Sequence, residues 1–168
     1  MASYEKGKKE VSNYIRKIYA KGSTCLDVGA CTGVWWDLLG DHLDMDAIEI
    51  YTPNYLGLLS RGCYGHVFYG DIRYFEYNAD VYDIIIFGDV IEHMSVEDAR
   101  EVLSYAWPRC EDMIVAVPYQ YKQGELYGNK WERHIQDDLT PEEFDKRYPG
   151  FTPLVQYSDY CYYHKGGI

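Results

Sequence analysis

The sequence has no hydrophobic run long enough to cross a membrane, and its lysine-containing N-terminus lacks the apolar core of a secretory signal. Its five cysteines are an odd number and include no C-x-x-C pair. This pattern argues against a disulfide framework and against a zinc site. We therefore expect a cytoplasmic protein in a reducing environment, with no membrane partner and no bound metal.

Basic residues are also scarce, since 16 Lys and Arg stand against 27 Asp and Glu, for a formal net charge of −11. Six of the basic residues lie within the first 21 positions, so the rest of the chain is more acidic still. A surface of that sign repels phosphate backbones, and we expect no nucleic-acid partner. The length of 168 residues predicts a single domain over 1–168.

The stretch TCLDVGACTG at 24–33 organises the chain, because an apolar run ends there at a glycine and helical spacing follows. This pattern predicts a strand, a tight turn and a helix. Gly29 and Gly33 bracket the turn, where a side chain would hold a ligand away from the backbone. A dinucleotide fingerprint needs further glycines at the positions of Cys31 and Val34, so a nicotinamide cofactor is disfavoured. Asp27, at the end of the strand, suits a cationic ligand instead.

Periodicity predicts the remaining elements of an alternating α/β chain. Further strands are expected at 45–51, 65–69, 82–87, 112–118, 152–157 and 160–165, and helices at 4–20, 34–43, 52–61, 95–107 and from 140. The leading segment 1–21 is interpreted as a packing helix with a solvated basic side, with a lid over the ligand cleft as the alternative. The irregular, aromatic segment 119–139 is interpreted as a substrate loop, because irregular segments of this length are usually functional or disordered.

The turn after Asp27 resembles the first motif of the class I S-adenosylmethionine-dependent methyltransferases. The residues DVIEH at 89–93 are similar to the D-x-x-E-H signature of small-molecule members, including the quinone-biosynthesis O-methyltransferases. The resemblance spans about 22–165. It implies a Rossmann-like three-layer sandwich with a seven-stranded, mostly parallel sheet and a C-terminal antiparallel hairpin, and it implies S-adenosylmethionine as cofactor. Cys31 is a departure, since the family often has glycine or proline there.

The resemblance and the strand-end positions together indicate a cofactor site built around acids at the tips of successive strands. Glu49 is expected to accept hydrogen bonds from ribose hydroxyls. In the resembling family, residues at the positions of Asp71 and Ile72 bracket the adenine ring. Asp89 lies at the carboxyl end of the next strand, and His93 is expected beside the methionine end of the cofactor. The predicted cofactor-binding residues are Asp27, Gly29, Ala30, Gly33, Glu49, Ile50, Asp71, Ile72 and Asp89.

His93 and His134 are the candidate catalytic bases, because histidine titrates near neutral pH. Each could equally be a structural, hydrogen-bonding histidine. Methyl transfer can proceed by alignment alone, which makes a base optional. A metal site formed by these histidines with Glu92 has no supporting ligand spacing.

The predicted function is methyl transfer from S-adenosylmethionine to an oxygen or nitrogen atom of a small-molecule acceptor. A non-catalytic cofactor-binding or acidic interaction module on the same fold is the alternative. A nicotinamide oxidoreductase is a third reading, which the missing glycines disfavour. Oligomeric state stays open between a monomer and a homodimer.

Overall fold

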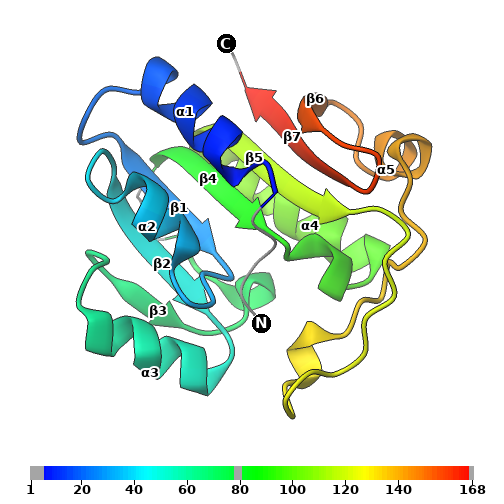
Figure 1. Cartoon of the computed structure of the whole chain (residues 1–168), viewed down its shortest axis with the longest axis horizontal. Coiled ribbons are helices and arrows are strands. Elements are labelled where there is room, and N and C mark those ends of the chain that lie inside the picture. Colours follow the sequence, from blue (N-terminus) through cyan, green and yellow to red (C-terminus); the bar gives the residue numbers. More distant parts are fainter. Residues whose placement is uncertain (1–5, 78–80, 167–168) are drawn as a thin grey trace.

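The computed structural model describes residues 6–77 and 81–166, in which strands and helices alternate (Figure 1). The strands are β1 (Thr24–Val28), β2 (Asp44–Glu49), β3 (Val67–Tyr69), β4 (Tyr82–Gly88), β5 (Cys110–Pro118), β6 (Thr152–Gln156) and β7 (Tyr160–Gly166). They form one sheet in the order β3-β2-β1-β4-β5-β7-β6. Neighbours pair in parallel except at β7, which is antiparallel to both β5 and β6. The predicted Rossmann-like sheet with a C-terminal hairpin is confirmed.

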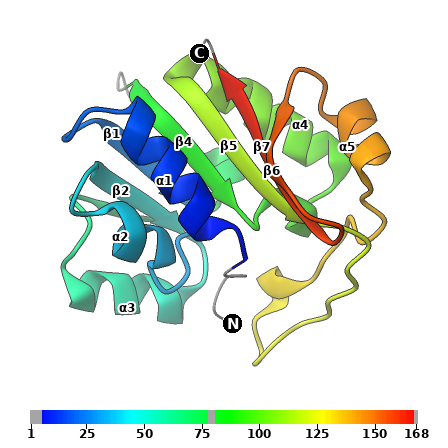
Figure 2. The same cartoon turned by 45° about the horizontal axis from the view of Figure 1, so that its top comes forward.

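Helices cover both faces of this sheet (Figure 2). The α-helices are α1 (Lys8–Ile18), α2 (Val34–Leu39), α3 (Thr52–Arg61), α4 (Val96–Ala106) and α5 (Pro141–Arg147). Short 3-10 turns are η1 (Ile72–Tyr74), η2 (Ile91–His93), η3 (Trp107–Arg109) and η4 (Lys130–Glu132). Buried side chains of α1, α2 and α3 share one hydrophobic core, and those of α4 and α5 share another. The sheet and the helices on its two faces form three layers, with one hydrophobic core on each side of the sheet.

The central strand β4 shows how one apolar run serves both cores. Ile84 and Ile86 pack with α1, α2 and α3, whereas Ile85 and Phe87 pack with α4 and α5. All four side chains are fully buried. A strand covered on both faces by helices has no solvent face, which is why its sequence is continuously apolar.

The predicted starts of two helices are confirmed by their caps. The Ser95 hydroxyl accepts a hydrogen bond from the backbone N–H of Asp98 at 3.0 Å. The Thr140 hydroxyl does the same for the N–H of Glu143 at 3.1 Å. Each cap satisfies a backbone donor that the first turn of a helix leaves without a partner.

One predicted helix end differs from the structure, and one predicted helix start lies outside the described residues. The expected helix 34–43 ends at Leu39, because the chain turns at Gly40, where a Cβ would lie 2.4 Å from the Trp36 ring. Leu43 is buried, but it follows the turn instead of continuing the helix. The expected start of the leading helix at residue 4 lies outside the described residues, and α1 begins at Lys8.

Tyrosine is unusually common, with 19 in the chain, and many of these side chains lie in the cores. Several of their hydroxyls have hydrogen-bond partners, as buried tyrosines usually do, although that of Tyr77 has none among the described residues. The Tyr64 hydroxyl donates to Asp27, Tyr148 donates to Gln136, and Tyr119 bonds to Tyr163. The tyrosines thus fill apolar space and satisfy buried polar groups together.

The parallel strands all end at one edge of the sheet, where β1 lies between β2 and β4. The chain leaves β1 toward β2 on one side and later enters β4 on the other. Open α/β sheets bind ligands at such a reversal of strand order, outside the carboxyl ends of the strands. Within the described parts of the chain, no helix has the length and apolar character that crossing a membrane requires.

Candidate active site

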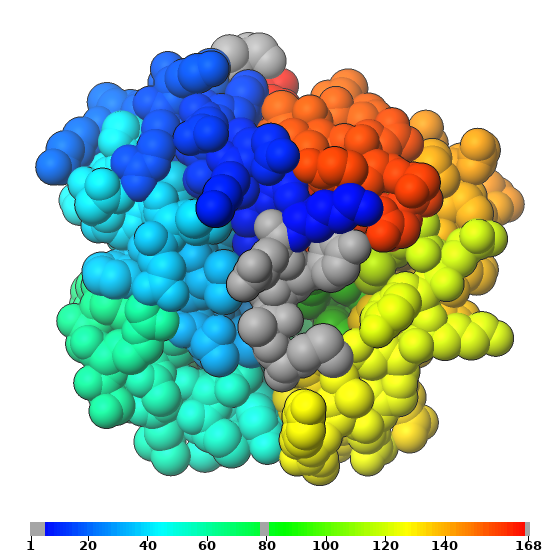
Figure 3. All heavy atoms as spheres, viewed as in Figure 1, coloured from blue at the N-terminus to red at the C-terminus, as the bar shows by residue number. Residues whose placement is uncertain are grey.

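A cavity of about 660 Å³ lies at the carboxyl ends of β1, β2, β4 and β5. Its walls come from the turn after β1, the segment after β2, the turns η1 and η2, and loop 119–139. In Figure 3 this loop, in yellow, lies beside the cyan segment that follows β2. Trp131 of the loop and Tyr51 share a second, smaller hollow there. The main cavity has the size of a small-molecule site.

Both glycines of the turn after β1 adopt the left-handed backbone conformation. Gly29 has φ of 67° and Gly33 has φ of 86°, values that side chains disfavour. A Cβ on Gly29 would also lie 2.8 Å from a methyl carbon of Val90. The turn therefore requires glycine for its own shape as well as for the approach of a ligand.

Cys31 lies between these glycines and is also left-handed, with φ of 52°. Its backbone N–H donates a hydrogen bond to Oε2 of Glu49 at 2.8 Å, which fixes this strained peptide. A non-glycine residue in this conformation costs about 1–2 kcal/mol. Glycine would adopt this backbone conformation without that strain.

Replacing Cys31 by glycine is expected to stabilise the protein by about 0.5–1 kcal/mol, since strain is relieved at some cost in chain entropy. Cys31→Ala is the matched control, because it also removes the thiol and its contact with Asn54 but keeps the Cβ. Urea denaturation of both variants checks the prediction. An equal stability change in the two would contradict it.

Three predicted cofactor residues, Asp27, Ala30 and Gly33, lie behind the cavity wall and do not line it. Asp27 is only 1% exposed and accepts a hydrogen bond from the Tyr64 hydroxyl at 2.6 Å. Burial raises the pKa of Asp27 to about 7, although Tyr64 and Lys8 act in the opposite direction. The predicted contacts of these three residues with a cofactor stay predictions.

Glu49 and Ile50, at the end of β2, do line the cavity. Oε1 of Glu49 accepts from the N–H of Tyr51 at 2.7 Å, and Oε2 accepts from Cys31. Burial raises the pKa of Glu49, and these two backbone donors oppose that effect. A carboxylate has about four acceptor positions, so the two donors fix its orientation and leave capacity for a ligand.

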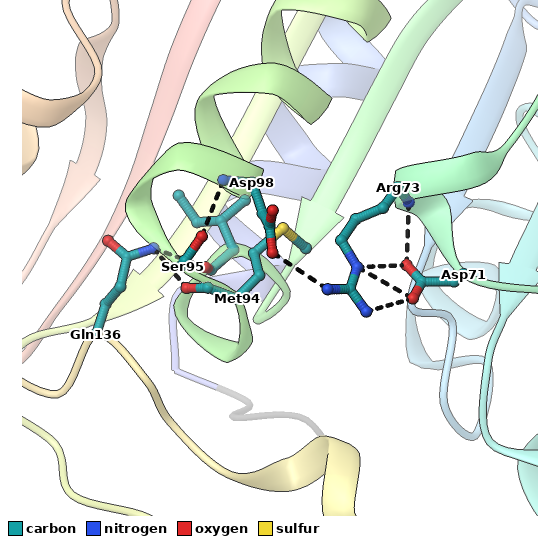
Figure 4. A network of polar contacts seen from close by, with 7 residues as sticks. Asp71, Arg73, Met94, Ser95, Asp98 and Gln136 are labelled. Atoms are coloured by element: carbon teal, nitrogen blue, oxygen red, sulfur yellow. Dashed lines mark hydrogen bonds and ion pairs between the residues drawn. The ribbon is translucent and has the colours of Figure 1, made fainter.

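Asp71 and Ile72 also line the cavity, but Asp71 is already engaged by Arg73. Figure 4 shows the Arg73 guanidinium against both carboxylate oxygens of Asp71, with Nη2 to Oδ2 at 2.6 Å. The Nη1 atom of Arg73 reaches Asp98 of α4 at 3.1 Å. Asp71 is thus held by a charged link from η1 to α4, which the sequence pattern did not indicate.

Asp89, at the end of β4, has contacts from both ends of the chain. Its Oδ1 accepts a hydrogen bond from the Tyr160 hydroxyl of β7, and its Oδ2 lies 3.9 Å from Nζ of Lys8. Lys8 is 1% exposed and lies over the Trp35 ring, with Nζ 4.4 Å from the ring centre. Burial lowers the pKa of Lys8. The sequence predicted that the basic side of the leading helix would be solvated. In the structure Lys8 of this helix is buried.

Glu92, His93 and His134 come together at the side of the cavity formed by η2 and loop 119–139. The two imidazole ring centres lie 4.8 Å apart. Burial lowers the pKa of both histidines and raises the pKa of Glu92 well above its ordinary range, with Asp89 adding to the latter. Both oxygens of Glu92 lack a hydrogen-bond partner among the described residues. The structure thus brings together the two histidines that were predicted from the sequence.

Sequence reasoning missed Lys8, Arg73 and Tyr160. Lys8 belongs to a helix whose other lysines, Lys9 and Lys17, are exposed, so composition did not single it out. Tyr160 reaches Asp89 from a strand 71 positions later. Contacts of this range follow from the strand order and not from local pattern.

No protein-family model matches the chain, and no curated protein matches it. Solved structures do match. A methyltransferase from Clostridium acetobutylicum, dependent on S-adenosylmethionine, has a TM-score of 0.73 at 12% identity, covering 99% of this chain and 93% of its own. The 1,6-didemethyltoxoflavin-N1-methyltransferase of Burkholderia thailandensis, with S-adenosylhomocysteine bound, has a TM-score of 0.70 at 16% identity, covering 97% and 80%.

The plantazolicin methyltransferase BpumL, in complex with S-adenosylhomocysteine, is similar with a TM-score of 0.67 at 12% identity, covering 96% of this chain and 82% of its own. Likeness at such low identity is evidence of common architecture, and function has to be argued from the site. The resemblance to the quinone-biosynthesis branch stays a prediction. The chain has the fold of the class I S-adenosylmethionine-dependent methyltransferases.

Proposed function

We propose that this protein transfers a methyl group from S-adenosylmethionine to an oxygen or nitrogen atom of a small-molecule acceptor. The observation that carries the proposal is a cavity at the ligand-binding edge of a methyltransferase-type sheet, walled by the carboxyl groups of Glu49, Asp71, Asp89 and Glu92. The donor carries a sulfonium and an ammonium against one carboxylate, so its net charge is positive. An acidic cavity complements that charge.

In this proposal different residues of the cavity wall bind different parts of the methyl donor. Glu49, oriented by two backbone donors, accepts hydrogen bonds from the ribose hydroxyls. Ile72 covers a face of the adenine ring, and Asp71, held by Arg73, borders it. Asp89 and the turn at Gly29 lie at the methionine end. Asp27, Ala30 and Gly33, which do not line the cavity, are proposed cofactor-binding residues at the same end.

Loop 119–139 is proposed to hold the acceptor, since it supplies Tyr121, Trp131 and His134 to the open side of the cavity. The bound donor would supply the activated methyl group, and the chain would align the acceptor with it. Nδ1 of His93 bonds to the carbonyl oxygen of Arg133, and Nδ1 of His134 to that of Tyr121. A carbonyl only accepts, so each neutral ring keeps its lone pair on Nε2. Without a bound ion, either ring can take the acceptor's proton.

The chemistry of the chain also supports the proposed setting. All five cysteines are free thiols, which suits a reducing cytoplasm. The acidic composition argues against a nucleic-acid acceptor.

Isothermal titration calorimetry with S-adenosylmethionine and S-adenosylhomocysteine tests the proposal. We expect one site with a Kd on the order of 1–100 μM, equivalent to about 5–8 kcal/mol. Incubation with a panel of hydroxylated and amino-bearing small molecules should then release S-adenosylhomocysteine. Donor binding without turnover would favour the non-catalytic module, and no heat with either compound would refute the proposal.

A further inference from the structure

Glu92, His93 and His134 form a cluster of side chains of the kinds that bind metal ions. Each offers a ligand atom, and the three atoms all lie within 4.8 Å of one another. Glu92 and His93 are neighbours in η2, whereas His134 comes from loop 119–139. No ligand spacing in the sequence joins these positions, which is why a metal was not expected.

Backbone hydrogen bonds hold the loop against η2. The carbonyl oxygen of Glu92 accepts from the N–H groups of Ile135 at 2.8 Å and Gln136 at 3.1 Å. The side-chain amide of Gln136 donates to the carbonyl oxygens of Ile91 and Met94, the latter drawn in Figure 4. His134 is therefore fixed beside His93 by main-chain contacts, and the three side chains are preorganised.

Both imidazole rings have the orientation that metal-binding histidines need. Nδ1 of His93 donates to the carbonyl oxygen of Arg133 at 3.1 Å, and Nδ1 of His134 donates to that of Tyr121 at 2.8 Å. Metal-ligating histidines usually donate their second ring N–H to a carbonyl or carboxylate in this way. Each ring is thereby turned so that Nε2 is the nitrogen left to bind.

The burial of the Glu92 carboxyl group without a hydrogen-bond partner indicates a cation site. The Glu92 side chain is fully buried, and neither carboxylate oxygen has a hydrogen-bond partner among the described residues. Burying a polar group without such a partner is costly, and coordination to an ion would give this carboxylate a partner. Asp89 and Glu132 add negative charge nearby, while Lys8 opposes it from beside Asp89.

We propose that Glu92, His93 and His134 bind one divalent transition-metal ion. Two imidazole nitrogens favour Zn²⁺ or a similar ion over Mg²⁺, which prefers oxygen ligands. Three protein ligands leave at least one coordination position open, as in catalytic zinc sites. That position faces the cavity, because all three residues line it.

A metal ion at this site would favour acceptors that carry a hydroxyl group. This inference about the acceptor rests on the proposed methyl transfer. A hydroxyl of the acceptor would fill the open position, and the ion would lower the pKa of that hydroxyl as it does for bound water. The hydroxyl proton would pass to solvent, and the oxygen–carbon bond would form as the methyl carbon–sulfur bond of the donor breaks. The histidines are then ligands, and no base is needed.

Titration of the reduced protein with Co²⁺, followed by absorption spectroscopy, tests the site directly, with displacement by Zn²⁺. We expect one equivalent to bind. Glu92→Gln and His134→Gln should each weaken binding more than about 100-fold, because even losing an outer partner of a ligand costs 10–100-fold. His66→Gln is the matched control, since the His66 side chain is exposed, lies outside the cavity lining and hydrogen-bonds to Asp46.

Circular dichroism spectra and melting curves of the variants establish that they fold. Equal Co²⁺ affinity in His134→Gln and His66→Gln, absorption typical of thiolate ligands, or no binding at all would overturn the metal site. The titration is made without the methyl donor, so it tests the metal site independently of the proposed methyl transfer. The protein could bind Co²⁺ without binding the donor, or bind the donor without binding Co²⁺. If methyl transfer continued unchanged in the presence of a chelator, the proposal that the ion binds the acceptor hydroxyl would be refuted, and the metal site itself would stand.

Discussion

Replacing Glu49 by glutamine is expected to weaken binding of S-adenosylmethionine about 30–100-fold, which corresponds to about 2–3 kcal/mol. The amide keeps the size of the side chain but has one acceptor oxygen in place of two. Its NH₂ group would face the N–H of Cys31 or Tyr51, both of which now donate to the carboxylate. One buried donor is left without a partner, and the negative charge that complements the cationic donor is lost.

Calorimetric titration of the variant with S-adenosylhomocysteine and S-adenosylmethionine measures this loss. Asp44→Asn is the matched control, because Asp44 is an exposed acid at the opposite end of the same strand. The control removes the same charge at a distance from the cavity and should bind the donor like the unmodified protein. Equal weakening in both variants would mean that overall charge, and not the position of Glu49, governs binding.

Replacing Asp27 by asparagine is expected to remove a large part of the pH dependence of stability. The pKa of Asp27 is raised by burial from 3.8 to about 7 in the folded protein. The folded state thus holds this proton more tightly than the unfolded chain does. Stability from Asp27 is fully present below pH about 4 and is lost as the pH rises to about 7.

Between pH 5 and pH 8 this loss amounts to about 2–3 kcal/mol in the free energy of unfolding. Asparagine stays neutral and can still accept the Tyr64 hydroxyl, so the variant should lack this loss. Urea denaturation at several pH values measures it, with Asp44→Asn as control. If Asp27→Asn and the unmodified protein lose stability in parallel, then burial does not hold the proton on Asp27. Alanine would be a poorer choice, because it also leaves Tyr64 without an acceptor.

Much of the fold was predictable because its signals are local. The apolar run of β4 reflects burial on both faces, and Ser95 and Thr140 begin their helices with their own hydroxyls. The boundary at Leu39 was missed because the turn at Gly40 depends on how the Trp36 ring packs against it. A periodic pattern of apolar residues continues past such a turn, since Leu43 is buried as well.

The candidate site was predictable only where a strand ends. Glu49, Asp71 and Asp89 follow strands directly, and the carboxyl ends of parallel strands meet at one edge. The sequence pattern did not indicate that Asp27 accepts a hydrogen bond from Tyr64 behind the cavity wall, because that contact depends on how distant segments pack. The pairing of Arg73 with Asp71 and the burial of Lys8 arise from packing between distant segments.

The meeting of α1 and β7 at Asp89 has a consequence for folding kinetics. The Tyr160 hydroxyl reaches this carboxylate across 71 positions of sequence, and Lys8 approaches it from the other end of the described chain. Loop closure of that length costs entropy before the contact forms, and high contact order slows folding. The methionine end of the cavity should therefore be among the last regions to reach native structure during refolding.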